Sequence, residues 1–216
     1  MFDNILTSKL PTAIEIGCGF FHVNSGFKTM LEIERVLYSD MDNNLKAATA
    51  IALFYPIGEN TNAAFPADFA EAIQALFDFK AQKGKRNYKP MQTNEPISLD
   101  FALDADAIFA DFWREYRIDL STTDLHWYVF LALFRNLSGE ASINEIRRIR
   151  STPVNKVPKD RQSKHLQAQE MYAIDANHDP IEEFNRKLME ECEKTKDYAR
   201  YNREKKQSLA KGMKNM

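Results

Sequence analysis

The sequence has few of the residues that mark disulfide-rich, metal-stabilised or exported chains. Two of its 216 residues are cysteines, Cys18 and Cys192, and they lie near opposite ends. They lack both the close pairing of a zinc site and the density of a disulfide scaffold, so free thiols are expected. The amino terminus has no basic region followed by an uninterrupted apolar run, so no signal peptide is expected.

A strong bias of charge is also missing. The net charge is −2, which argues against a protein whose main task is to neutralise phosphates. Basic residues do gather from Arg147 to Lys164, but few aromatic residues lie among them and no helix-turn-helix or zinc-finger signature is present. A solvated basic surface is therefore favoured over a nucleic-acid site.

The most apolar run, LHWYVFLALFRNL from Leu125 to Leu137, is too short for a membrane span. A bilayer requires roughly 20 residues of helix. On a helical wheel the run is apolar nearly all round, and such a helix must be covered on more than one side. It is therefore either the central helix of an α-helical core, or a helix with part of its face left as a groove or oligomer surface.

Local patterns predict a mainly α fold, a small helical bundle with a short N-terminal β-hairpin. The hairpin is expected around Gly17 and Gly19, between β-branched and aromatic residues. N-caps are expected at Asn24 or Ser25, at Asn43 or Asn44, and among the Ser, Thr and Asp residues at 121–124, and Pro66 is expected in a first helical turn. The predicted helices span residues 24–40, 43–56, 66–82, 104–120, 121–139 and 142–153.

We expect one helical domain over residues 1–175. Inside it, residues 83–97 are basic and rich in helix breakers, which predicts an exposed linker. The stretch from Pro153 to Lys164 is expected to be basic and irregular. Residues 176–216 are strongly charged with a weak apolar stripe, which predicts a long exposed C-terminal helical extension.

No motif supports an enzyme, a cofactor or a metal site. Gly17 and Gly19 do not continue into a dinucleotide fingerprint, and the four histidines are scattered. Asp104 and Asp111 would share a helix face, as paired catalytic or metal-binding acids can. The stronger alternative is that acids are placed at a helix start by its dipole, since a metal would need ligands from another element.

The order of motifs resembles the bacteriophage gene-product-15 family, small proteins of long-tailed phages and prophages. The resemblance covers about residues 5–172. Its elements are Leu10-Pro11 before the hairpin, VNSGFKTML, LFYP at 53–56, LDFALDADAIFADFWREYRIDL, and LHWYVFLALFRNLSGEASINEIRRIR. Tyr128 stands where the family usually has a second tryptophan, and Arg117 where it tends to have glycine.

This resemblance implies a tail morphogenesis protein, encoded near the tape-measure gene. It suggests a non-enzymatic chaperone in the host bacterial cytoplasm that binds the tape-measure protein. Tail-tube subunits and further copies of the protein itself are the other partners that the resemblance suggests. Its apolar surface would come from one helix, with companions on the neighbouring one: Trp127, Phe130, Leu131 and Phe134, with Phe109, Phe112 and Trp113. The alternatives are a tail-completion or connector component of the virion and, less favoured, a nucleic-acid-binding regulator.

Overall fold

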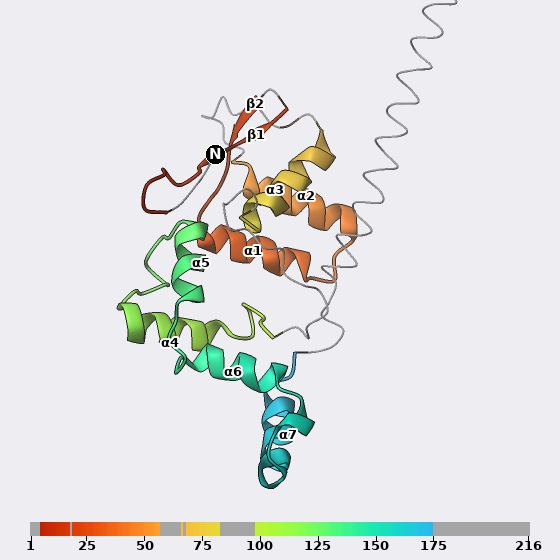
Figure 1. Cartoon of the computed structure of the whole chain (residues 1–216). Helices are drawn as coiled ribbons and strands as arrows, with labels where there is room; N and C mark the ends of the chain where they lie inside the picture. The colour runs from red at the N-terminus through yellow and green to blue at the C-terminus, as the bar shows by residue number, and fades with distance from the viewer. Residues whose placement is uncertain (1–4, 18, 57–65, 67, 83–97, 175–216) are drawn as a thin grey trace, which may run out of the picture.

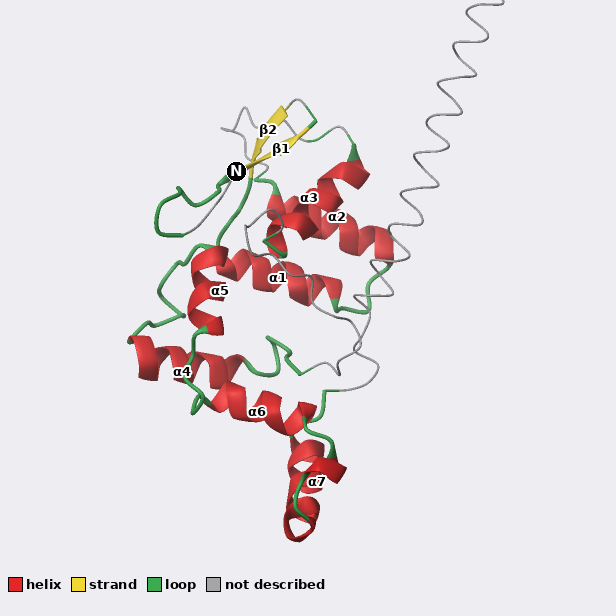
Figure 2. Ribbon diagram, in the orientation of Figure 1, coloured by secondary structure: helices red, strands yellow, loops and turns green. Residues whose placement is uncertain are grey.

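The computed structural model describes residues 5–17, 19–56, 66, 68–82 and 98–174. Cys18, Cys192, the linker predicted at 83–97 and the C-terminal extension predicted at 176–216 lie outside these residues. The mainly α class with an N-terminal hairpin is confirmed (Figure 2). The elements are β1 (Ala13–Ile16), β2 (Gly19–His22), α1 (Phe27–Leu37), α2 (Asn43–Phe54), α3 (Phe69–Lys80), α4 (Ala105–Tyr116), α5 (Trp127–Arg135), α6 (Ser142–Ser151), η1 (Val154–Lys156), η2 (Lys159–Arg161) and α7 (Gln162–Met171).

The hairpin depends on glycine as the sequence predicts. β1 and β2 pair antiparallel with Ile16 opposite Gly19, which leaves two residues in the turn. The first of them, Gly17, has φ of 58°, in the left-handed region that side chains disfavour. This is the backbone conformation that two-residue hairpin turns require.

Figure 1 shows α1, α2 and α3 grouped beside the hairpin, α4 and α6 at the other end of the body, and α5 between the two groups. The ring of Phe130 in α5 occupies the centre. It stacks on Phe27 of α1, with centroids 4.9 Å apart, and on Phe112 of α4, at 5.3 Å. Because Phe130 is fully buried between these helices, α5 joins the two groups into one core.

Helices α1 and α5 begin side by side. An isolated antiparallel bridge pairs Gly26 with His126, through bonds from Phe27 N to Leu125 O (2.8 Å) and from Trp127 N to Ser25 O (2.7 Å). Each bond uses a backbone N–H that its own helix cannot satisfy. Two helix starts that lie a hundred residues apart in the chain are therefore fixed together.

Several predicted N-caps are wrong because other residues precede the helices. Gly26, rather than Asn24 or Ser25, precedes α1, since the Asn24 amide side chain donates to Leu53 O at 2.7 Å. Asp42, not Asn43 or Asn44, caps α2 by accepting from the Asn44 N–H.

The starts of α3 and α5 also differ from the prediction. Asp68 caps α3 through the N–H groups of Ala70 and Glu71, so Pro66 lies before the helix and not in its first turn. His126, not a residue of 121–124, caps α5. The region from Pro153 to Lys164, predicted to be irregular, contains η1, η2 and the start of α7.

Helix α4 ends at a residue in a left-handed conformation. Arg117 has φ of 56° and ψ of 30°, and its N–H donates to Trp113 O at 3.2 Å. Glycine is the usual residue at such a helix end because it has no Cβ to clash with the backbone. The preference for glycine that the family resemblance implies here therefore has a structural reason.

We expect Arg117→Gly to raise the free energy of unfolding, by up to about 1 kcal/mol, because glycine relieves the left-handed strain. Arg117→Ala is the matched control: it removes the same long side chain but keeps Cβ, so it should bring no such gain. Urea denaturation measures both. A glycine variant no more stable than the alanine variant would contradict the strain.

Candidate interaction surface on helix α4

Helix α4 has a buried face and an exposed face, and they carry different chemistry. Ile108, Asp111 and Phe112 point into the protein. Phe109 and Trp113, one turn apart on the other side, are 40% and 49% exposed. An aromatic pair at this spacing on a solvated helix face is the kind of feature that marks protein contacts.

The buried carboxylate of Asp111 holds the start of α6. It is fully buried and accepts from the N–H groups of Ser142 (3.0 Å) and Ile143 (2.9 Å). Arg114 adds a charged hydrogen bond at 2.8 Å. A negative charge at the N-terminus of a helix is favoured by the helix dipole, and here the charge comes from a neighbouring helix.

Asp104 holds the other end of α6. It forms a two-bond ion pair with Arg150, at 2.7 and 2.8 Å, and both side chains are nearly inaccessible to solvent. Arg150 also donates to Ser98 O and to Tyr172 O, at 3.2 and 2.6 Å. One guanidinium therefore ties α4, α6 and the residues after α7 together.

The partners of Asp104 and Asp111 favour a structural use for this pair over a catalytic or metal-binding one. Their oxygens accept from backbone N–H groups and from arginines, which leaves no converging set of carboxylates. Over the described residues, no group of three or more His, Cys, Asp or Glu side chains is arranged to hold a metal ion.

Five of the seven residues predicted to bind a partner lie in the core: Trp127, Phe130, Leu131, Phe134 and Phe112. Trp127 donates from Nε1 to Lys80 O at 2.9 Å, and its ring stacks on Phe130. This agrees with the interpretation of the apolar run as a central core helix. The remaining two, Phe109 and Trp113, are those that a partner can reach.

The two hydrogen bonds of the His126 ring favour one tautomer of its neutral form. Its Nδ1 accepts from the Tyr128 N–H at 3.0 Å, so the proton lies on Nε2, which donates to Pro11 O at 2.9 Å. Burial lowers the pKa of His126 and outweighs the opposing effect of the Pro11 bond. Next to it, burial raises the pKa of Tyr128 to about 12.

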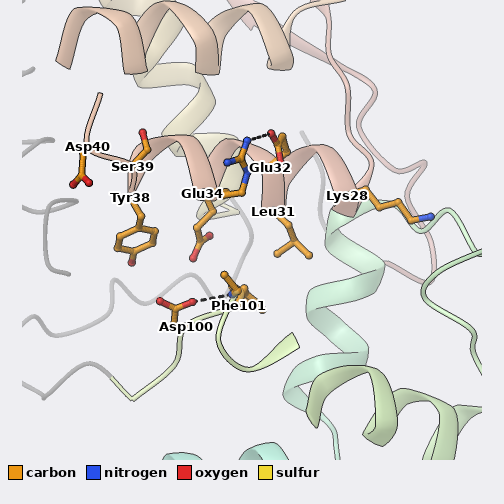
Figure 3. A pocket seen from close by; sticks show the side chains of 11 residues that line it. Lys28, Leu31, Glu32, Glu34, Tyr38, Ser39, Asp40, Asp100 and Phe101 are labelled. Atoms are coloured by element: carbon orange, nitrogen blue, oxygen red, sulfur yellow. Dashed lines mark hydrogen bonds and ion pairs between the residues drawn. The ribbon is translucent and has the colours of Figure 1, made fainter. Parts of the chain in front are cut away.

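A recess of about 620 Å³ lies between α1 and the segment before α4 (Figure 3). Apolar groups of Leu31, Tyr38 and Phe101 line it together with the carboxylates of Glu32, Glu34, Asp40 and Asp100. Glu32 pairs with Arg35, and Glu34 with Lys80. We call this the α1 recess.

The comparisons with known proteins agree with the motif order. The family model described as bacteriophage Gp15 protein matches residues 6–174. No curated protein and no solved structure gave a match. The chain belongs to the bacteriophage Gp15 protein family, and it is a phage structural or morphogenesis protein. No helix in the described part of the chain is both long and apolar enough to cross a membrane.

The sequence predicted seven apolar residues as a partner surface but could not assign the helix faces on which they lie. Asp111 lies on the inner face of α4, and Phe109 and Trp113 lie outside it. The residues of α6 that bind Asp111 are 31 and 32 positions away in the chain, so the local sequence of α4 does not identify them. The sequence does contain one signal for the inner face of α4. Asp111 and Phe112 follow Ile108 by three and four residues, and residues at these spacings lie on one side of a helix.

We expect Trp127→Ala to lower the free energy of unfolding by about 3–5 kcal/mol, because it empties a core site and removes the bond to Lys80 O. Trp113→Ala removes the same side chain from an exposed site and should cost less than about 1 kcal/mol. Urea denaturation compares the two. Equal costs would contradict the core position of Trp127.

We expect the protein to lose stability as the pH falls below about 6.5, the ordinary pKa of histidine, because folding favours neutral His126. The contribution is complete above that pH and declines toward the lowered pKa of the folded state. His126→Asn keeps an N-cap acceptor without a titrating ring, so the loss should be smaller. His22→Asn, on exposed β2, is the control and should keep the wild-type pH profile in thermal denaturation.

Proposed function

We propose that the protein is a non-enzymatic tail assembly chaperone, which binds the tape-measure protein in the host bacterial cytoplasm until tail-tube subunits replace it. The family supports phage morphogenesis in general. The observation that carries the finer proposal is the exposed pair Phe109 and Trp113 on a helix that is otherwise firmly held.

The rigidity of α4 makes this pair suitable for binding. Its inner face is fixed by Asp111 and Asp104, and Phe112 stacks on Phe130. Presenting the two aromatic side chains from a fixed helix lowers the entropy lost when a partner binds. Aromatic anchors of this kind carry much of the energy of protein interfaces.

The partner that fits is a long amphipathic helix with a repeated apolar stripe. Two aromatic side chains at i and i+4 can pack against such a stripe at many places along it. Each contact would be small and weak, while many copies on one long partner would coat it. Weak individual contacts would also let polymerising tube subunits displace the chaperone.

We expect coexpression with the tape-measure protein of the same phage to keep that protein soluble, and Phe109→Ala/Trp113→Ala to abolish the effect without unfolding the chaperone. Phe20→Ala, which removes an aromatic ring 76% exposed on β2, is the control and should keep the wild-type effect. The fraction of tape-measure protein in the supernatant is the measurement.

Two outcomes would contradict parts of this proposal. If tape-measure solubility does not depend on the wild-type protein, the chaperone function is wrong. If the wild type is active and the double variant is equally active, the α4 surface is wrong. Mass spectrometry of purified virions tests the remaining alternative, since a chaperone should be absent and a tail-completion or connector component present.

A further inference from the structure

Residues 142–174, which comprise α6, η1, η2 and α7 and are called the arm here, differ from the rest of the described chain. No side chain of η1, η2 or α7 is buried. Hydrogen bonds hold α7 against α6 instead. Gln169 donates to Ile149 O and Thr152 O, and Arg150 donates to Tyr172 O. Figure 1 shows α7 beyond α6, on the side away from α1.

The arm also differs in charge. It carries seven Lys or Arg against three Asp or Glu, whereas residues 1–141 carry twelve against nineteen. The near-neutral chain is therefore divided into an acidic body and a basic arm. Opposite charges separated in this way attract across molecules, and a net charge of −2 leaves little overall repulsion between copies.

The basic groups near the tip of the arm are available for such a contact. Arg150 is engaged by Asp104, and Arg148 pairs with Glu145. Lys156, Lys159 and Lys164 are exposed and form no ion pair among the described residues. Beside them, Leu166 and Met171 are 48% and 77% exposed, so the arm offers apolar surface as well as charge.

The α1 recess has the complementary chemistry. Leu31, Tyr38 and Phe101 provide apolar lining. Of the four carboxylates at the recess, Glu32 pairs with Arg35 and Glu34 with Lys80, and Asp100 accepts from backbone N–H groups. The carboxylate of Asp40 forms no ion pair among the described residues and gives the recess its acidic edge. Asp40 lies exposed at its edge, as Figure 3 shows at the end of α1. A recess of about 620 Å³ is large enough to take more than one side chain.

We propose that the arm of one copy docks in the α1 recess of a second copy, so that the protein associates head to tail. The contact joins two different surfaces, so each added copy leaves a free arm and a free recess, which leads to a ring or an open chain. Charge complementarity within one sequence favours a second copy over an unrelated acidic partner. Nothing in this inference depends on binding to a tape-measure protein.

Sedimentation velocity on the full-length protein tests the inference, from about 1 to about 100 µM and at about 50 and 500 mM NaCl, where charge screening differs strongly. We expect association at low salt and dissociation at high salt. Wild-type protein that stays monomeric at low salt over this range would overturn the proposal.

Paired charge reversals locate the contact. Lys159→Glu/Lys164→Glu reverses the arm, and Glu32→Lys/Asp40→Lys reverses the recess; each should weaken self-association at least tenfold. An equimolar mixture of the two variants should regain association, because each variant keeps the wild-type surface that the other lacks and the two reversed surfaces attract each other. Lys9→Glu/Arg117→Glu is the control for the arm variant. It makes the same change of charge as that variant but lies outside both surfaces, so it should associate like wild type.

Circular dichroism confirms that each variant is folded. Self-association that survives in the arm variant, or a mixture that remains monomeric, would overturn the docking mode. So would a wild-type protein that stays monomeric at low salt while its arm retains duplex DNA, because the basic arm would then serve nucleic acid.

Discussion

The position of Asp111 is the constraint on which much of the structure depends. A carboxylate with no exposure to solvent must have its charge balanced by donors, and here the donors are Arg114 and the first N–H groups of α6. The charge therefore holds the start of α6, and the ion pair of Asp104 with Arg150 holds its last turn. Because its inner face is occupied in this way, α4 presents Phe109 and Trp113 to solvent. Helix α6 leads to η1, η2 and α7, on the side away from α1 (Figure 1).

Much of the fold follows from local patterns that need no tertiary information. The helical spacing of Phe27, Met30 and Ile33 and the glycine turn at Gly17 are short-range signals, and the elements that they predict are present. The N-caps are not predicted by local patterns. Asn24 donates to Leu53 O and His126 accepts from the Tyr128 N–H at the start of α5, and both positions depend on long-range packing. Helix α7 was missed because its apolar residues do not form one stripe and its hydrogen bonds go to α6 and Thr152.

The candidate surface shows the same limit. The sequence does not distinguish the aromatic residues that could bind a partner. By sequence alone, Trp127 is as suitable for binding as Phe109, Phe112 or Trp113. Packing separates them: Phe112 stacks on Phe130, Trp127 reaches Lys80 O, and the other two are left outside. Which side of a helix is covered depends on the partner helix, and the local sequence does not record it.

The bridge between Gly26 and His126 has a consequence for how the chain is made. Synthesis proceeds from the amino terminus, so α1, α2 and α3 leave the ribosome well before the residues that complete their core. Until Tyr128 and Phe130 emerge, Phe79 and Phe27 lack the aromatic neighbours in α5 that they have in the folded protein. A truncated product ending before residue 126 would retain α1 to α4 with an uncovered apolar face, and it would be prone to aggregation.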